Sequence, residues 1–169
     1  MEKSNRGFTL VELMVVSGIL LVSIGFGSAQ YNTYTQQRRL REEVKKMITI
    51  MTLAGKRAVS GDSGTGCTDF QGFQIAVTPG GTYTSRRCCE SACNSAQSAI
   101  ASSESLPLGL TFTAPAVNTT YLFNKLNQAV TINPPVNQTI TIRNTVLSRC
   151  ISLTIAPSGL ITQTPEVAC

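Results

Sequence analysis

The sequence is 169 residues long, enough for one globular domain and an anchoring segment. It contains no His and no Trp, and its formal net charge is +5. Because His is the commonest general base and the commonest metal ligand, its absence argues against most classes of enzyme and metal site. For this reason no catalytic residue, metal ligand or cofactor is expected. The mild positive charge does not identify a partner.

The chain begins with a short polar segment, residues 1–7, and continues with 22 almost uniformly apolar residues, 8–29. A helix of that length would rise about 33 Å, which matches the hydrocarbon thickness of a bilayer. A secretory signal peptide would have a shorter apolar core of about 7–15 residues. Its cleavage region would have to be the small residues at the end of the segment, Gly25, Gly27, Ser28 and Ala29.

The charged residue inside the apolar segment is Glu12. A carboxylate in a bilayer costs about 2.5–3.5 kcal/mol on insertion scales, so it usually has a partner. No Lys or Arg lies between Phe8 and Gln37, so we expect the partner to come from elsewhere. Cleavage after Gly7 would create an ammonium group on Phe8 that suits Glu12. The ammonium group of the same chain lies one helical turn away, but that of a neighbouring copy would also set the axial register of two helices. Neither a signal peptide nor a plain single-pass anchor explains this residue.

The stretch GFTLVELMVV resembles the processing site of type IV prepilins and pseudopilins, over about residues 1–30. The resemblance implies cleavage between Gly7 and Phe8 by a prepilin peptidase, followed by N-methylation of Phe8. It implies that Glu12 guides docking into a growing filament. Many major pilins have Pro near the end of the apolar run, whereas Ala29 stands here, which favours a minor subunit.

The basic residues Lys3 and Arg6 precede the apolar run. By the positive-inside rule they keep the N-terminus in the cytoplasm. The resemblance then implies a single-pass inner-membrane protein whose C-terminal domain is periplasmic and later part of an extracytoplasmic filament.

Residues 30–60 become polar but keep a helical period. Apolar residues recur at steps of four, three, four and seven and form one stripe: Leu40, Val44, Met47, Met51 and Ala58. Directly after an apolar helix, this pattern predicts the second half of one long helix, which ends at Gly61. The basic cluster Arg38–Lys46 on the opposite face fits a solvated surface, contact with anionic lipid or a neighbouring subunit, or DNA binding.

Residues 61–169 are predicted to form a β-rich domain after a Gly/Ser-rich linker, 60–66. Runs rich in Thr, Val and Ile predict strands at 70–77, 108–113, 121–123, 129–133 and 139–146. We expect residues 79–106 to form a long loop, with a short helix at 94–103.

The ending ISLTIAPSGLITQ predicts a hairpin that turns at Pro157–Gly159. It is similar to the last hairpin of the GspH/FimT group of minor pseudopilins and pilins. DNA-binding members of that group carry arginines just after this Gly, whereas Leu160, Ile161 and Thr162 follow Gly159 here. The predicted fold class is therefore α+β and type IV pilin-like, with a long helix on a small antiparallel sheet.

Six cysteines all follow residue 60: Cys67, Cys88, Cys89, Cys93, Cys150 and Cys169. This placement favours disulfides in an oxidising compartment over a zinc site, because paired C-x-x-C spacing is missing. The hairpin suggests that Cys150 bonds to Cys169. The other four would then form two bonds, with the adjacent Cys88 and Cys89 holding separate partners.

The sequence thus predicts a non-enzymatic minor pilin or pseudopilin, a subunit of a type IV pilus or type II secretion pseudopilus. Its partners would be other subunits, the prepilin peptidase and the inner membrane. The alternative is a binding module at a filament tip, an adhesin or a DNA-uptake subunit, whose surface would be the loop around Arg86 and Arg87.

Overall fold

The structure is a computed structural model. It describes residues 8–90, 93, 98, 100–126, 129–136 and 138–169, with no account of the side chains of 24–29. The chain divides into two compact units, Met1–Gln36 and Gln37–Cys169.

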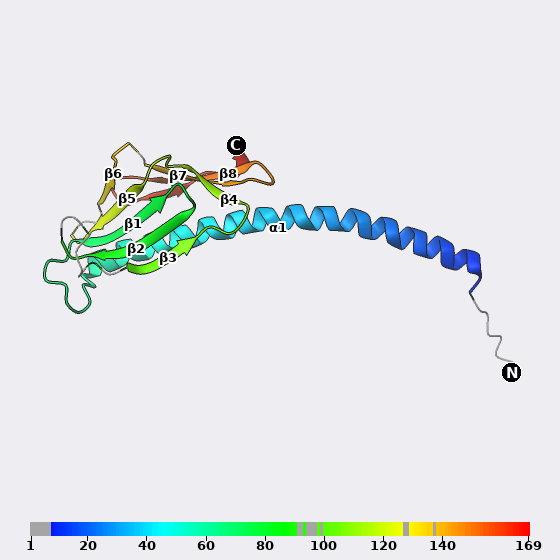
Figure 1. The fold of residues 1–169 in the computed structure, drawn as a ribbon, viewed down its shortest axis with the longest axis horizontal. Helices are drawn as coiled ribbons and strands as arrows, with labels where there is room; N and C mark the ends of the chain where they lie inside the picture. The colour runs from blue at the N-terminus through cyan, green and yellow to red at the C-terminus, as the bar shows by residue number, and fades with distance from the viewer. Residues whose placement is uncertain (1–7, 91–92, 94–97, 99, 127–128, 137) are drawn as a thin grey trace. The chain divides into compact units, whose positions relative to one another are not determined.

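A single α-helix, α1 (Leu10–Ser60), contains 51 residues and contributes to both units (Figure 1). No proline interrupts it. It ends in a Schellman motif, because Gly61 adopts a positive φ of 69°. The amide of Gly61 then donates to the carbonyl of Ala58, and the amide of Asp62 donates to the carbonyl of Arg57. The helix end predicted at Gly61 is therefore confirmed.

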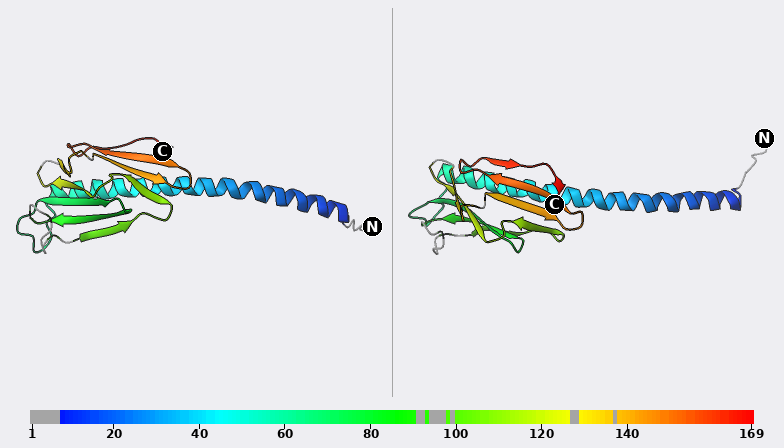
Figure 2. Two further views of the ribbon diagram at one scale, coloured as in Figure 1. Left: turned by 45° about the horizontal axis from the view of Figure 1, so that its top comes forward. Right: turned by 90° about the horizontal axis from the view of Figure 1, so that it is seen from above.

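In the described part of the chain, ten strands follow the helix: β1 (Gly72–Thr78), β2 (Thr82–Cys88), β3 (Ile100–Ser105), β4 (Leu110–Ala114), β5 (Thr119–Asn124), β6 (Val130–Asn133), β7 (Thr139–Asn144), β8 (Arg149–Ile155), β9 (Ile161–Gln163) and β10 (Val167–Ala168). They form two antiparallel sheets (Figure 2). One sheet has the order β3-β2-β1-β5-β6. The other has the order β10-β8-β7-β4, with β9 also paired to β8.

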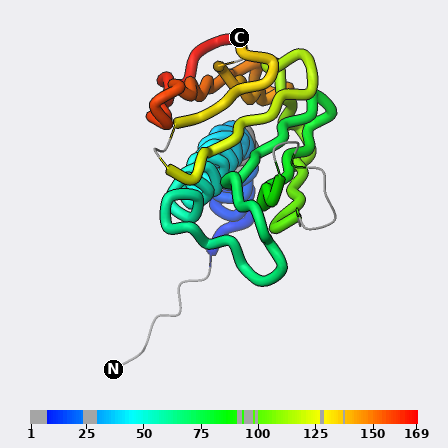
Figure 3. Tube along the Cα trace, turned by 90° about the vertical axis from the view of Figure 1, so that its left-hand side faces the viewer, coloured from blue at the N-terminus to red at the C-terminus, as the bar shows by residue number. Residues whose placement is uncertain are grey.

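The second half of α1 packs on both sheets, as seen along the helix in Figure 3. The predicted stripe is buried, with at most 1% of any of its side chains exposed: Leu40, Val44, Met47, Met51 and Ala58. The sheets contribute alternate residues of their strands to the same core, because successive strand side chains point to opposite faces. The α+β fold class, with a long helix, antiparallel sheets and disulfides, is consistent with a type IV pilin-like fold.

Gly72 permits a close approach between β1 and β5. Its φ of 146° lies in the region that favours glycine, and a Cβ at this position would overlap the carbonyl oxygen of Phe123. Gly72 pairs with Cys88 on one side and Asn124 on the other, so the close approach holds three strands of one sheet in register.

Three expectations about the β-rich domain were wrong. The single small sheet is in fact two sheets. The loop expected at 79–106 contains β2 and β3. The short helix expected at 94–103 is contradicted where the structure describes it, because residues 100–103 belong to β3. The remainder of that segment, apart from residue 98, lies outside the described residues.

Proline stands beside most edges of the two sheets. Pro107 and Pro115 flank β4, Pro134 follows β6, and Pro165 separates β9 from β10. Proline lacks an amide proton and cannot extend a ladder, so these residues limit the length of the neighbouring strands. Pro107 also lies two residues after the edge strand β3, and the edge strands β3, β4 and β6 contain no proline themselves.

Candidate functional sites

The first turn of α1 is closed by a reciprocal pair of hydrogen bonds between Thr9 and Glu12. The amide of Glu12 donates to the Thr9 hydroxyl over 3.2 Å, and the Thr9 amide donates to Glu12 Oε2 over 3.0 Å. The Thr9 hydroxyl also donates to Oε2 over 3.1 Å. This is a capping box, in which Thr9 is the N-cap and Glu12 the third helical residue.

The capping box corrects the expectation that Glu12 has no partner within its own segment. The spacing Thr-x-x-Glu before an apolar run is the sequence signature of this motif. Both bonds from Thr9 use Oε2, and no hydrogen bond to Oε1 is found within the described ranges. One carboxylate oxygen therefore remains for a donor from another molecule.

Large apolar side chains stay exposed along the first unit. Eleven of them have exposed fractions between 52% and 84%: Phe8, Leu10, Val11, Leu13, Met14, Val15, Val16, Ile19, Leu20, Leu21 and Val22. An exposed apolar surface of this extent marks a surface that another molecule or a lipid phase covers. Residues 1–7, including Gly7, Lys3 and Arg6, lie outside the described part of the chain.

Most of the predicted membrane anchor, residues 8–29, falls in the first part of α1. Over the residues that the structure describes, no helix combines the length and apolar character needed to cross a membrane. The membrane-spanning role expected for residues 8–29 remains a prediction.

Ion pairs occupy part of the basic cluster on α1. Arg38 pairs with Glu42 on the helix itself at 2.6 Å. The cluster also reaches both sheets, because Arg41 lies 2.9 Å from Glu166 and Lys46 lies 2.8 Å from Glu104. The hydrogen bond from Lys46 to Glu104 raises the pKa of the Lys46 ammonium group. These contacts give three of the basic residues a structural role within their own chain.

The arginines proposed for a binding loop are also engaged within the chain. Arg86 donates from Nη1 to the carbonyl of Cys93 over 3.1 Å, and Arg87 donates from Nη2 to the carbonyl of Thr65 over 3.4 Å. Both lie in β2 rather than in a loop. Guanidinium groups that hold backbone carbonyls are less available to the phosphates of a nucleic acid.

All six cysteines are paired. Cys67 bonds to Cys89 and Cys88 bonds to Cys93, so the adjacent cysteines do hold separate partners. Cys150 bonds to Cys169, the pairing expected from the hairpin. No cluster of residues suited to a metal ion occurs in the described ranges.

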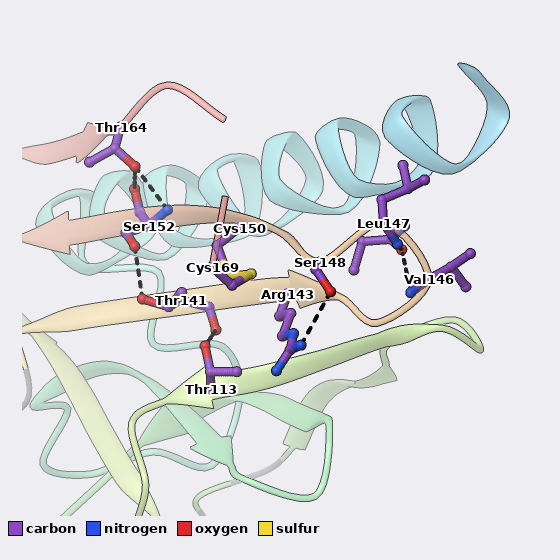
Figure 4. The surroundings of a disulfide bond; sticks show 11 residues. Thr113, Thr141, Arg143, Val146, Leu147, Ser148, Cys150, Ser152, Thr164 and Cys169 are labelled. Carbon is purple, nitrogen blue, oxygen red and sulfur yellow. Dashed lines mark hydrogen bonds between the residues drawn. A yellow bond between two sulfur atoms is a disulfide. The ribbon is translucent and has the colours of Figure 1, made fainter. Parts of the chain in front are cut away.

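Figure 4 shows the surroundings of the Cys150–Cys169 bond. The amide of Cys169 donates to the carbonyl of Ser148 over 3.0 Å, beside the disulfide. Further along β8, the amide of Ser152 donates to the Thr164 hydroxyl over 3.0 Å. Thr164 thereby continues the pairing with β8 across the gap between β9 and β10. The disulfide and these bonds fix the last segment of the chain to the sheet.

The N-terminal segment of the chain is similar to a known protein family. Residues 3–28 match the family model of the prokaryotic N-terminal methylation motif. This motif supports a prepilin-processed, type IV pilin-like protein and does not reach the β-rich domain. Searches of curated proteins and of solved structures found no match.

Proposed function

We propose that this chain is a minor pilin or pseudopilin, a structural subunit of a type IV pilus or a type II secretion pseudopilus. A prepilin peptidase cleaves between Gly7 and Phe8, and the new amino group of Phe8 is methylated. The observation that carries the proposal is Glu12 in the first turn of an exposed apolar helix, inside the matched methylation motif.

The apolar helix supports both membrane anchoring and assembly. In the proposed sequence of events, residues 8–29 hold the subunit in the inner membrane with the N-terminus in the cytoplasm. The same surface then packs against other subunits in the filament. Three disulfides in the second unit suit an oxidising periplasm.

Glu12 supports a docking role because its geometry leaves Oε1 free of any hydrogen bond in the described part of the chain. An ammonium group on Phe8 of a neighbouring copy would bond to that oxygen. Leaving one of these charges unpaired away from water is costly, so the pair would favour the one axial register of two helices in which both are satisfied. The capping box keeps the carboxylate ordered before the partner arrives.

Thr9 provides the control that separates docking from helix capping. In Thr9→Ala the cap is lost, at a cost of about 1 kcal/mol, and the carboxylate remains. In Glu12→Gln the side chain can still bond back to the Thr9 amide, and the charge is lost. We expect Glu12→Gln to lower the fraction of subunits in purified filaments at least about tenfold, with Thr9→Ala close to wild type.

Both variants should reach the membrane at wild-type levels. Equal losses of incorporation in Thr9→Ala and Glu12→Gln would mean that Glu12 acts only as a helix-capping residue.

Mass spectrometry of the native protein tests the processing step separately. The expected N-terminus is Phe8 with one added methyl group, and a protein that keeps Met1 or begins after Ala29 would contradict the proposal.

A further inference from the structure

Two neighbouring loops of the second unit expose apolar side chains. Leu108 is 96% exposed in the loop between β3 and β4, and Val146 is 64% exposed in the turn between β7 and β8. The loops are bonded to each other, because Thr145 donates from its amide and its hydroxyl to the carbonyl of Gly109, over 2.9 and 3.1 Å. The two apolar side chains therefore belong to one end of the unit.

The turn between β7 and β8 is held in shape by a buried side chain (Figure 4). Asn144 is fully buried, and its Oδ1 accepts hydrogen bonds from the amides of Val146 and Leu147, each over 3.0 Å. Val146 is thus presented to solvent by a preformed turn rather than by a loop that must first become ordered.

This end of the second unit is also the end at which α1 enters it. The turn leads into β8, whose first residue, Arg149, pairs with β10. Glu166, directly before β10, forms its ion pair with Arg41, and the second unit begins at Gln37, one helical turn earlier. We define the entry surface by three exposed side chains: Leu108, Val146 and Arg149.

The entry surface is basic as well as apolar. Residues 106–109 and 145–149 contain no acidic side chain. Arg149 and Arg39, which precedes Leu40 on α1, are exposed, and no ion pair to either guanidinium group is found among the described residues. Apolar side chains flanked by arginines suit the interface of an anionic bilayer, because the former are buried at shallow depth and the latter bind phosphate groups.

Chain length determines which anionic partner is always within reach. Residues 8–29 are the proposed bilayer segment, and only residues 30–36 separate them from the second unit. These seven residues belong to α1 and rise about 10 Å, little more than the headgroup layer of about 5–8 Å on each side of a bilayer. A bilayer that holds the anchor therefore stays close to the entry surface, whereas a nucleic acid would first have to be recruited.

We infer that the entry surface docks onto anionic phospholipid while the subunit is still in the membrane. Leu108 and Val146 enter the bilayer interface, and Arg149 binds lipid phosphate. The inference rests on the proposed anchoring of residues 8–29 and goes beyond it, because an anchor alone requires no contact between the second unit and lipid.

Methyl signals in the full-length protein measure this contact. The protein, labelled with ¹³C-methyl Leu and Val, is placed in nanodiscs of phosphatidylcholine alone or mixed equally with phosphatidylglycerol. A trace of phosphatidylcholine with a spin-labelled headgroup broadens the signals of methyl groups near the lipid surface. Both lipid mixtures contain the same amount of spin label.

Leu126 is the internal control, because it is 84% exposed at the opposite end of the unit. It follows β5, whose last residue, Asn124, pairs with Gly72 at the start of β1. The loop that carries Leu108 is instead bonded to the turn after β1, where the amide of Leu106 donates to the carbonyl of Gly81.

In nanodiscs with phosphatidylglycerol, we expect the spin label to broaden Leu108 and Val146 at least about fivefold more than Leu126, and phosphatidylcholine alone should remove most of that difference. Arg149→Glu should reduce the broadening of Val146 at least about fivefold, because each basic group near an anionic surface strengthens binding by about that factor. Lys56→Glu, an equal change of charge near the C-terminal end of α1, should leave it unchanged.

A second variant and a core signal keep the test independent of folding defects. Leu108→Ser, read at Val146, should also lower the broadening, because it removes an apolar group from the bilayer interface. The methyl groups of Leu153, which is fully buried in β8, report whether each variant keeps its native packing.

Three results would overturn the inference. The first is equal broadening of Val146 and Leu126 with phosphatidylglycerol present. The second is broadening of Val146 that neither Arg149→Glu nor the loss of phosphatidylglycerol reduces. The third is a shift of the Leu108 and Val146 signals only in nanodiscs that hold two copies, which would assign the entry surface to a neighbouring subunit. A chain that enters neither kind of nanodisc would instead contradict the proposed anchor, and the inference with it.

Discussion

Thr9 and Glu12 show how one carboxylate can serve a single chain and an assembly in turn. Within the chain, Oε2 closes the capping box. In the proposed filament, Oε1 meets the ammonium group of a neighbour. The charge of Glu12 was apparent from the sequence, but the direction of its two oxygens was not, because side-chain geometry depends on where the helix begins. In the proposed assembly, the carboxylate would therefore be positioned before it docks.

Tyr121 makes stability depend on pH. The residue is fully buried, and burial raises the pKa of its phenol well above the usual value. Above about pH 10 the unfolded chain releases this proton whereas the native state keeps it, so the free energy of unfolding falls as pH rises. Tyr121→Phe should reduce that slope by up to about 1.4 kcal/mol per pH unit.

The measurement is urea unfolding at pH 9 and pH 11, with Tyr31→Phe as the control because Tyr31 is 73% exposed. A Tyr121→Phe protein that loses as much stability as wild type between the two pH values would contradict this assignment. Tyr83 contributes in the same direction, because burial also raises the pKa of its phenol. The slope should therefore shrink in Tyr121→Phe without vanishing.

At the scale of elements, the sequence predicted the helix and the strands β1 and β4 to β9, and it missed β2, β3 and β10. The helical stripe has a 3.6-residue period, and strands such as β7 alternate buried and half-buried residues. By contrast, β2 (TYTSRRC) and β3 (IASSES) contain a single aliphatic residue larger than Ala, Ile100. Their strand structure comes from pairing with β1 and with each other, which composition does not reveal.

The buried stripe of α1 should carry much of the stability of the second unit. Leu40 is fully buried, whereas the adjacent Arg39 is exposed. Leu40→Ala is expected to lower the free energy of unfolding by about 2–5 kcal/mol, because it removes buried methyl groups and leaves a cavity. Arg39→Ala should change it by less than about 0.5 kcal/mol.

Chemical unfolding of the disulfide-intact protein measures both variants under the same conditions. Equal effects of the two substitutions would mean that this turn of the helix does not pack on the sheets. The comparison uses neighbouring positions of one helix, so differences in helix propensity stay small relative to the expected loss.

At the scale of the whole molecule, the disulfides join segments whose proximity the local sequence patterns do not predict. The hairpin alone suggested the Cys150–Cys169 bond, because it returns the chain toward the start of β8. The other two bonds did not follow from spacing, since four cysteines in one region allow three pairings. The structure joins Cys67 to Cys89 across the linker after α1, which ties the end of the helix to β2.

Loss of the Cys150–Cys169 bond should destabilise the protein by about 3 kcal/mol in the chain-entropy model, because it frees a loop of about 20 residues. The double variant Cys150→Ser/Cys169→Ser, compared with wild type in urea unfolding, measures this contribution. The hydrogen bonds of Thr164 to β8 should keep β9 in place. A stability equal to wild type would show that those bonds alone hold the segment.

The prolines beside the sheet edges bear on how densely such a protein can be stored. At high local concentration, copies of a chain collide often. Open strand edges can then pair between copies and seed fibrous, amyloid-like aggregates. Pro107, Pro115, Pro134 and Pro165 stand in the connections beside the strands, where they stop each ladder after a few residues. Any pairing between copies at these edges would therefore be short.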